Sequence, residues 1–422
     1  MASTVKMLAV SSSSAELYKS SFLTGSKYFP LARNTKTSAV TPAVSNRELQ
    51  IEAKKGEWLA SHSFPAPLNG TGNALRLRLE RERRIAAADG GEQLSTISLQ
   101  IPEEKEAEEE EEELSRGEVL LRAAKLPIYS VAVVPLSVGG AVAFWQTGVF
   151  NATRYWLMFW SSILIITWLN LSNDAYDWET GVDLNKRESV VNITGSQKGV
   201  LRAALGCLLL GFSGLVFGAS RANDMRVAVL LAAAIGCGYI YQCPPFRLSY
   251  KGLGEPLCFL AFGPLATTAF YLGQGQPSAT AGLPVTLSIL GASVLVGITT
   301  SLILFCSHFH QIEGDISAGK LSPLVRMGTA NGSKVVQTAV TVLYLLTATL
   351  TAAKAVPPSC AIFSLLTLPI GKLVLDFIRD NHSNKELIFM AKYYAVRLHV
   401  AFGVALVLGF SLASRLKIRA VW

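Results

Sequence analysis

From Leu126 onward, the sequence contains nine apolar segments, each close to the length of about 20 residues that a helix needs to cross a membrane. Charged residues make up only 16% of the 422 residues, against about 25% in a typical soluble domain. Both features argue against an ordinary soluble fold. We therefore predict an all-α polytopic membrane protein with nine transmembrane helices, at about residues 126–148, 155–175, 199–219, 226–243, 254–273, 283–308, 334–353, 356–376 and 396–414.

The residues before the first apolar segment have a different composition. The first 47 residues are rich in Lys, Arg, Ser and Thr, and their single acidic residue is Glu16, which is typical of an organelle transit peptide. The stretch 103–113 then contains nine Glu residues, and such a charged sequence buries too little apolar surface to fold. We predict a plastid transit peptide at about residues 1–50, a disordered charged linker at 51–117 and a transmembrane domain at 118–422.

The net charge of +8 arises from Lys and Arg in the short loops between apolar segments, because the Glu run is strongly negative. This placement argues against nucleic acid as a partner and is typical of the charge bias that orients proteins in membrane lipid. The loops after the second, fourth, sixth and eighth segments hold more Lys and Arg than the opposite loops. We expect these even-numbered loops to face the side from which the chain inserted, which is the stroma in a plastid.

The second apolar segment runs directly into the sequence NLSNDAYDWETGVD, from Asn170 to Asp183. Ionisable groups at membrane depth are costly, so such a cluster indicates a functional site. On a helix, Asn170, Asn173 and Asp177 share one face, and Asp174 flanks it. Carboxylate and amide oxygens suit Mg²⁺, which keeps some of its waters and bridges to phosphate oxygens.

A second polar cluster, PPFRLSYKGLGE at residues 244–255, follows the fourth apolar segment. Two prolines end the helix, and Arg247, Tyr250 and Lys251 then supply two cations and a hydroxyl. Arg and Lys are the expected partners of phosphate groups. Basic residues after a span also serve membrane topology, so this cluster is informative only together with the others.

The third polar cluster, SHFHQIEGDISAGK at residues 307–320, ends the sixth apolar segment. His308, Gln311 and Asp315 are spaced at i, i+3 and i+7, which places them on one face of a continuous helix, with Glu313 on a different face. The two histidines of this stretch are two residues apart and do not share a helix face. This spacing argues against a zinc site.

Acidic and basic clusters at the mouth of an apolar bundle fit a metal-bound diphosphate that carries an apolar tail. The metal neutralises the phosphates, and an allylic diphosphate then becomes a leaving group and yields a carbocation. An aromatic ring such as that of Tyr241 stabilises such a cation. An ion-coupled transporter is an alternative, but transporters often carry helices broken at the midplane, whereas these acids lie at helix ends.

The three clusters resemble the motifs of the UbiA superfamily of intramembrane aromatic prenyltransferases. NLSNDAYDWETGVD is similar to the first aspartate-rich motif of that family, through Gly181 and Asp183, and the order of the clusters and the nine-helix count also agree. SYKGLGE and GDISAGKLSPLVRMGT resemble the MenA branch, which joins a prenyl diphosphate to 1,4-dihydroxy-2-naphthoate. The resemblance covers about residues 120–415.

The resemblance implies a Mg²⁺-dependent enzyme and a role for each matching residue. The implied metal ligands are Asn173, Asp174, Asp177, Asp183 and Asp315; the implied substrate-binding residues are Asn170, Tyr241, Arg247, Tyr250, Lys251, His308 and Gln311, with Lys198 as a further candidate. Glu179 lies off the acidic helix face and is not part of the predicted site. The family's second motif usually has two aspartates four residues apart, and Gln311 replaces the first of them here, so we expect a weaker second metal site.

In a plant plastid, the resemblance implies phytyl diphosphate as the donor and dihydroxynaphthoate as the acceptor, which loses its carboxylate as the ring is alkylated. The implied pathway is the synthesis of phylloquinone (vitamin K1). The alternative within the same family is a plastid prenyltransferase that acts on another aromatic acceptor, such as homogentisate.

Overall fold

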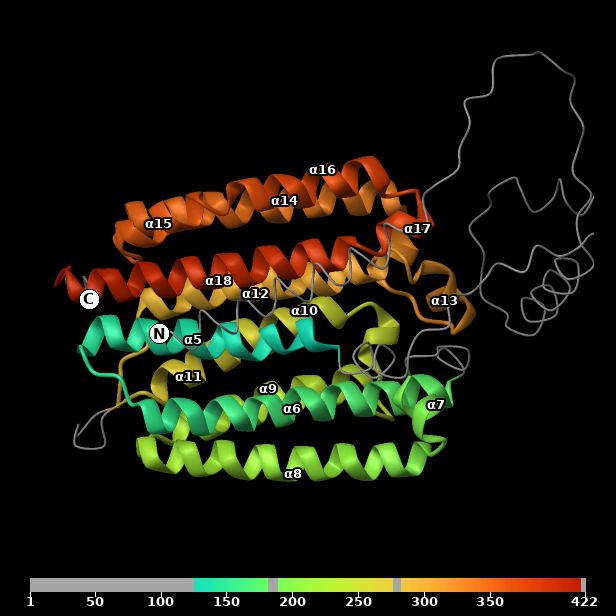
Figure 1. Ribbon diagram of the computed structural model, residues 1–422, viewed down its shortest axis with the longest axis horizontal. Coiled ribbons are helices and arrows are strands. Elements are labelled where there is room, and N and C mark those ends of the chain that lie inside the picture. Colours follow the sequence, from blue (N-terminus) through green and yellow to red (C-terminus); the bar gives the residue numbers. More distant parts are fainter. Residues whose placement is uncertain (1–124, 181–188, 276–281, 419–422) are drawn as a thin grey trace, which may run out of the picture. The chain divides into compact units, whose positions relative to one another are not determined.

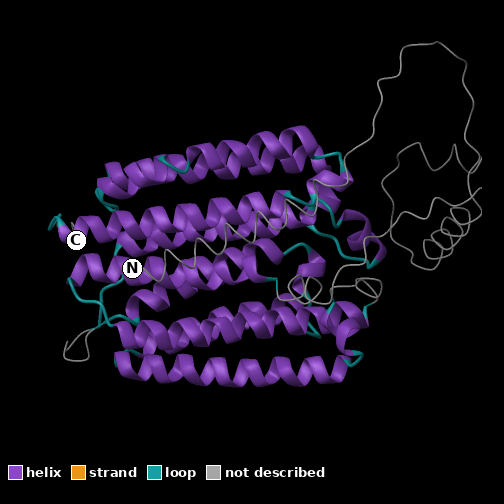
Figure 2. Cartoon of the chain, in the orientation of Figure 1, coloured by secondary structure: helices purple, strands orange, loops and turns teal. Residues whose placement is uncertain are grey.

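The computed structural model describes residues 125–180, 189–275 and 282–418 (Figure 1). Figure 2 shows that helices joined by short loops make up this part of the chain. The predicted transit peptide at 1–50, the predicted linker at 51–117 and Asp183 lie outside the described residues. These assignments stay predictions.

Eight helices among the described residues are long and apolar enough to cross a membrane, and a bent pair of helices supplies a ninth span. This confirms the predicted all-helical membrane bundle. The spans are η1 (Leu126–Tyr129) with α5 (Ser130–Thr147), α6 (Ala152–Glu179), α8 (Gln197–Ala222), α9 (Met225–Gln242), α10 (Gly254–Leu260) with η3 (Ala261–Thr267) and α11 (Thr268–Leu272), α12 (Leu287–His308), α14 (Pro323–Ala352), the bent pair α15 (Pro358–Leu365) and α16 (Leu368–Asn381), and α17 (Lys385–Ile388) with α18 (Ala391–Arg415).

Prolines account for the irregular spans. The span expected at 356–376 is the bent pair α15 and α16, whose axes differ by 46°. Pro358 and Pro369 each stand at the start of one helix of the pair, where the missing N–H of proline costs no hydrogen bond. The fifth span has a π-helical middle, η3, around Pro264, whose ring disfavours regular α-helical bonding.

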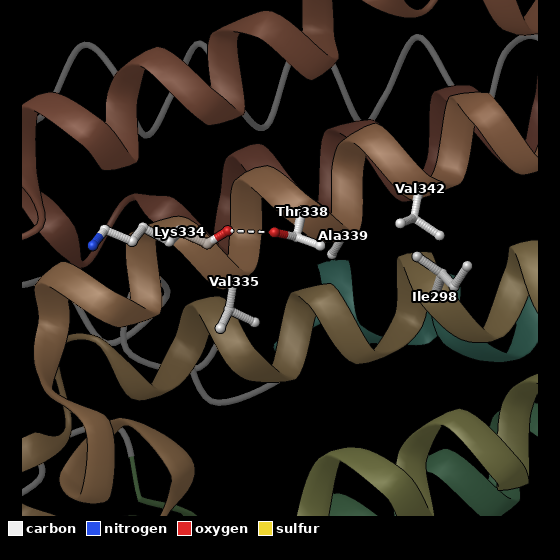
Figure 3. Close-up of a pocket in the computed structure, with 6 residues that line it drawn as sticks. All are labelled: Ile298, Lys334, Val335, Thr338, Ala339 and Val342. Atoms are coloured by element: carbon white, nitrogen blue, oxygen red, sulfur yellow. Dashed lines mark hydrogen bonds between the residues drawn. The ribbon is translucent and has the colours of Figure 1, made fainter.

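Helix α12 lies at the centre of the bundle and packs against α5, α10, α14 and α18. Where α12 meets α14, the side chains leave a groove of about 370 Å³. Figure 3 shows Ile298 of α12 facing Val335, Ala339 and Val342 of α14 across this groove, with Lys334 at its margin. The groove is therefore apolar, with one cation beside it.

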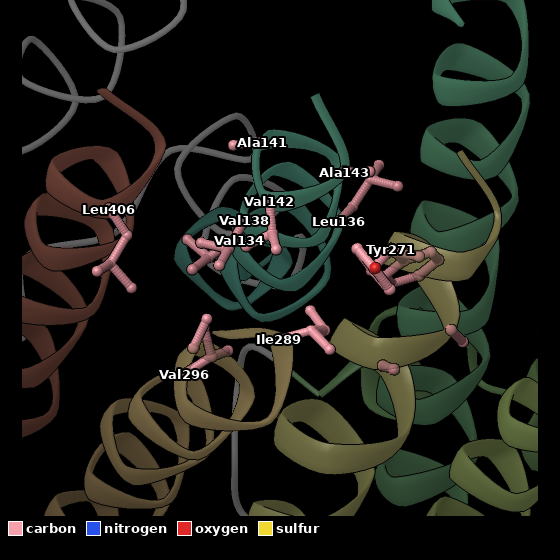
Figure 4. Close-up of a cluster of buried hydrophobic side chains, with 14 of the residues drawn as sticks. Val134, Leu136, Val138, Ala141, Val142, Ala143, Tyr271, Ile289, Val296 and Leu406 are labelled. Atoms are coloured by element: carbon pink, nitrogen blue, oxygen red, sulfur yellow. The ribbon is translucent and has the colours of Figure 1, made fainter. Parts of the chain in front are cut away.

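The main hydrophobic core lies between α5, α11, α12 and α18. Figure 4 shows Val138 and Val142 of α5 close to Ile289 of α12, with Tyr271 of α11 and Leu406 of α18 on either side. Lipid tails are as apolar as these side chains, so close packing rather than exclusion of water stabilises such contacts in a membrane.

A buried polar contact joins three of these helices. Nδ1 of His399 on α18 lies 2.8 Å from the Thr299 hydroxyl oxygen on α12, and its Nε2 lies 3.3 Å from the backbone carbonyl oxygen of Ser130 on α5. His399 is fully buried. Because both ring nitrogens have partners, this histidine fixes the relative positions of the three helices.

Candidate active site

The first acidic cluster lies on the last turns of α6, which stays helical to Glu179. The side-chain amide of Asn173 donates a hydrogen bond to Oδ2 of Asp177 at 3.0 Å. The Tyr250 hydroxyl donates to Oδ1 of Asp177 at 3.4 Å and lies 3.1 Å from the Thr180 hydroxyl oxygen. The first and second polar clusters of the sequence therefore meet, and the predicted helix face with Asn173 and Asp177 is present.

The second cluster forms a tight loop that ends in η2 (Leu248–Lys251). A guanidinium N–H of Arg247 donates to Oε2 of Glu179 at 3.0 Å, and the guanidinium lies 5.9 Å from the centre of the Tyr176 ring. Burial raises the pKa of the Tyr250 hydroxyl above its usual range, so this group stays a neutral hydrogen-bond donor. The helical angle of Glu179 predicted a position outside the site. Its contact with Arg247 nevertheless connects it to the second cluster.

The third cluster is not one continuous helix. Helix α12 ends at His308, the chain turns through Gln311, and the short helix α13 (Ile312–Ser317) carries Asp315. The expected shared face at i, i+3 and i+7 is therefore absent. Phe309 is buried beside Leu324 in a second hydrophobic cluster, and this contact accompanies the change of direction.

Asp315 is buried and close to the second cluster. Its Oδ1 lies 3.2 Å from Nζ of Lys320, whereas its Oδ2 has no hydrogen-bond partner among the described residues. The backbone N–H of Leu321 donates to the carbonyl oxygen of Tyr250 at 2.8 Å. The loop after α13 is therefore fastened to the loop that carries Arg247.

Tyr241, near the end of α9, lies between the clusters. Its half-buried side chain is within electrostatic range of the carboxylates of Asp177 on α6, Glu255 on α10 and Asp315 on α13. Carboxylates from three helices are therefore found in the region around one aromatic hydroxyl. The arrangement brings residues of all three predicted clusters into one region of the fold.

Glu255 is the principal residue that the sequence analysis missed. Its Oε1 lies 2.9 Å from Nδ1 of His308, which stands 53 positions later in the chain. Glu255 belongs to the SYKGLGE stretch, but no spacing rule connects it to a histidine at the end of another helix.

Other predicted site residues have different surroundings. Asp174 is buried, and its Oδ2 accepts hydrogen bonds from the Ser189 hydroxyl at 2.9 Å and the Val191 N–H at 3.1 Å, at the start of the short helix α7 (Val190–Thr194). Lys198 is exposed at the start of α8, and among the described residues no hydrogen bond or ion pair joins its side chain to the clusters. The amide nitrogen of Asn170 is buried without a partner in the described part of the chain.

A comparison with known families decides the class of this bundle. The model of the UbiA prenyltransferase family matches residues 132–396, which is more than half of the chain. The chain belongs to the UbiA prenyltransferase family. The predicted family and the predicted enzyme class, a prenyltransferase, are confirmed.

Individual relatives of this UbiA-family chain agree with that assignment. A protein of Arabidopsis thaliana named 2-carboxy-1,4-naphthoquinone phytyltransferase, chloroplastic, is 56% identical over 301 residues, which cover 71% of this chain and 79% of that protein. A Synechocystis protein named 2-carboxy-1,4-naphthoquinone phytyltransferase is 42% identical over 293 residues, which cover 69% and 93%. The solved structure of a UbiA homologue from Aeropyrum pernix K1 has a TM-score of 0.51 at 15% identity, covering 67% of this chain and 98% of that one, which shows a shared fold.

The donor set of the UbiA-family site fits a metal ion that a substrate helps to hold. Among the described residues, no group of three His, Cys, Asp or Glu side chains forms a complete metal cage. Asp177 with Asn173, and Asp315 with its unpartnered Oδ2, supply separate oxygen ligands. Mg²⁺ is commonly bound by one or two carboxylates together with substrate phosphates and water, which this pattern allows.

Proposed function

We propose that this protein transfers a phytyl group from phytyl diphosphate to 1,4-dihydroxy-2-naphthoate, with Mg²⁺ as cofactor and loss of the acceptor's carboxyl group. The product is a phytyl-naphthoquinol on the route to phylloquinone. The observation that carries this proposal is the contact between the acidic end of α6 and the basic loop after α9, through Asp177 and Tyr250. The names of the relatives from Arabidopsis and Synechocystis support the choice of both substrates.

Each side chain has a distinct task in this proposal. Asn173, Asp177 and Asp315 hold Mg²⁺, which when bound neutralises the diphosphate and makes it a better leaving group. Arg247 and Lys251 donate to the phosphate oxygens, and Arg247 releases Glu179 as it does so. Charge-assisted hydrogen bonds of this kind hold the departing diphosphate in place while the new carbon–carbon bond forms.

The aromatic and apolar parts of the site protect the reactive carbon. Tyr241, whose hydroxyl is within electrostatic range of three carboxylates, supplies an aromatic ring, and the face of such a ring stabilises an allylic cation. The surrounding helices exclude water, which would otherwise trap the cation as an alcohol. The phytyl chain extends into the apolar bundle.

We also propose a chloroplast membrane as the location, with the site on the stromal side. The basic, acid-poor N-terminal sequence supports this location, as does the word chloroplastic in the name of the Arabidopsis relative. Import into isolated chloroplasts followed by protease treatment of thylakoid and envelope fractions tests it. Failure of the full chain to enter chloroplasts would contradict the location.

The activity is tested with the purified full-length protein in lipid nanodiscs. Phytyl diphosphate and dihydroxynaphthoate with Mg²⁺ should yield phytyl-naphthoquinol and one equivalent each of CO₂ and diphosphate, and removal of Mg²⁺ by EDTA should stop the reaction. A parallel reaction with homogentisate tests the alternative acceptor. Turnover of homogentisate without turnover of the naphthoate would overturn the proposed acceptor but not the prenyltransferase chemistry.

A further inference from the structure

Glu255 and His308 form a buried pair that the proposed diphosphate chemistry does not use. Oε1 of Glu255 and Nδ1 of His308 are 2.9 Å apart, and their side chains are only 13% and 3% exposed. Glu255 comes from the first turn of α10 and His308 from the last turn of α12. Burial of a charged group is costly unless its hydrogen-bonding atoms have partners.

Glu255 has one oxygen without a partner. Its Oε2 is buried, and no donor among the described residues lies within hydrogen-bonding distance. A carboxylate oxygen is an acceptor only, so the missing partner is a donor such as a hydroxyl group. His308 holds the other oxygen and so fixes the direction in which Oε2 points.

Glu255 also lines a groove of about 300 Å³ between α10, α12 and α14. Two aromatic side chains, Phe259 and Phe305, line the same groove, and the rest of its wall is nearly all apolar. It shares Ile298, Val335 and Ala339 with the groove in Figure 3, so the two grooves are adjacent. An apolar, aromatic-lined space with one oriented acceptor is suited to a flat aromatic hydroxy compound.

This groove adjoins the proposed diphosphate site. Tyr241 is within electrostatic range of Glu255 and also of Asp177 and Asp315. Tyr241 also lies against the backbone at Gly254, the residue before Glu255, because a Cβ built on that glycine would be 3.0 Å from the Tyr241 ring. Glu255 thus lines the aromatic-lined groove and directly follows the residue that Tyr241 contacts.

We propose that Glu255 accepts the ring hydroxyl proton of the aromatic acceptor, that His308 is its positioning residue, and that the acceptor ring lies in the groove between α10, α12 and α14. This inference rests on the proposed function and names the acceptor side of the same site. Removal of the proton raises the electron density of the ring and so its reactivity as a nucleophile.

Alkylation of the ring and loss of its carboxyl group follow from this proton transfer. The O–H bond of the ring hydroxyl breaks, and its proton moves to Oε2 of Glu255. The ring carbon that bears the carboxylate forms a bond to the allylic carbon, and the carbon–oxygen bond to the diphosphate breaks. The carboxylate leaves as CO₂, its bonding electrons restore the aromatic ring, and Glu255 returns the proton to the ring oxygen.

Substitution of Glu255 in the full-length protein tests this role. Glu255→Gln keeps the size of the side chain and an oxygen for His308, but a neutral amide is a poor proton acceptor. We expect kcat to fall about 100-fold or more, the usual contribution of general acid–base catalysis, while the KM for phytyl diphosphate stays unchanged. A fluorinated dihydroxynaphthoate, whose hydroxyl groups ionise more readily, should lose less activity than the parent acceptor in this variant.

Variants of His308 test whether this residue positions Glu255 or only stabilises the fold. His308→Ala should lower kcat about tenfold, and His308→Asn should restore part of the loss because its amide nitrogen takes the place of Nδ1. The matched control is Glu313→Gln, the same chemical change at an exposed residue that pairs with Lys385 on the surface. Mg²⁺-dependent binding of phytyl diphosphate should be alike in all these proteins, and the unfolding temperature should fall in His308→Ala alone, where the buried Glu255 loses its partner.

The outcomes distinguish this inference from the proposed function. If the wild-type protein does not alkylate dihydroxynaphthoate, both are overturned. If the wild-type protein is active and Glu255→Gln keeps kcat within about threefold, the proton acceptor is another group and only this inference is overturned. If the KM for phytyl diphosphate in Glu255→Gln rises as much as kcat falls, Glu255 acts on the diphosphate side of the site. That result would also overturn the inferred role of Glu255 as proton acceptor.

Discussion

The backbone N–H of Val191 donates a hydrogen bond to Oδ2 of Asp174 at 3.1 Å, so a carboxylate of the acidic stretch anchors the helix that follows it. The Ser189 hydroxyl donates to the same oxygen, and Nζ of Lys125 lies 4.0 Å from Oδ1. The Asp174 side chain is 1% exposed. Asp174 therefore has a structural role in addition to the metal-binding role that its motif implies.

We expect Asp174→Ala to lower the free energy of unfolding by about 1–3 kcal/mol, because the Ser189 hydroxyl and the Val191 N–H lose a buried partner. Asp174→Asn should cost less, since its amide oxygen still accepts both bonds. Thermal unfolding of the detergent-solubilised proteins measures the difference. An unchanged unfolding transition in Asp174→Ala would show that the stability of the fold does not depend on this anchor. Because the substitution also disturbs the fold, a loss of activity in Asp174→Ala does not by itself identify Asp174 as a metal ligand.

Asp177 allows a sharper test of the metal site, because its carboxylate accepts hydrogen bonds from Asn173 and Tyr250, two residues of the site itself. Asp177→Asn keeps an oxygen for Asn173 and Tyr250 but removes the negative charge. We expect kcat to fall about 100-fold or more, with a higher Mg²⁺ concentration for half-maximal activity. Steady-state kinetics across a Mg²⁺ titration measures both.

A matched control for Asp177→Asn is Asp224→Asn, at the opposite end of α9 from Tyr241. Hydrogen bonds from Arg226 hold the pKa of Asp224 below its usual range, so this pair adds stability at neutral pH that is lost as the pH falls through the pKa of the folded state. Asp224→Asn should therefore reduce stability and leave kcat near normal. Equal losses of kcat in both variants would contradict a specific metal role for Asp177.

The fold was largely predictable because long apolar segments leave few alternatives to membrane-spanning helices. The structural details depend on tertiary contacts. Helix α6 continues past the predicted segment to Glu179, and the chain turns after His308, beside the buried Phe309, instead of continuing as one helix to Asp315. Hydropathy gives the length of a segment but not the residue at which its helix ends.

The candidate site was predictable where it depends on helical spacing alone. Asn173 and Asp177 contact each other because they are one turn apart. The contact of Arg247 with Glu179 joins a loop to a helix end 68 positions away. Helical periodicity predicts neighbours within one helix only, so it could not predict this contact. The contact between Glu255 and His308 was not predicted for the same reason.

Gln311 replaces an aspartate of the family motif, and restoring the acid tests whether the second metal site is weak. Gln311 is half-buried at the N-cap of α13, a position where Asp is favourable because it accepts from free backbone N–H groups. We expect Gln311→Asp to fold normally and to lower the Mg²⁺ concentration for half-maximal activity by about threefold to tenfold, an effect of one added charged ligand. Gln311→Ala is the control, and loss of activity in Gln311→Asp would mean that the amide itself contacts a substrate.

Gly409 allows the close approach of α18 to α15. A Cβ at this position would lie 2.5 Å from the Cα of Cys360, and the Ser359 hydroxyl donates to the Gly409 carbonyl oxygen at 2.7 Å. Backbone atoms cannot move aside as a flexible side chain would, so Gly409→Ala must separate the two helices. We expect a loss of about 1–3 kcal/mol in the free energy of unfolding, a usual cost of overpacking.

Gly206→Ala on α8 is the matched control, because its Cβ would meet no atom within 4 Å. Thermal unfolding of both variants in one detergent measures the difference. Equal unfolding temperatures would mean that the contact between α15 and α18 adjusts without cost.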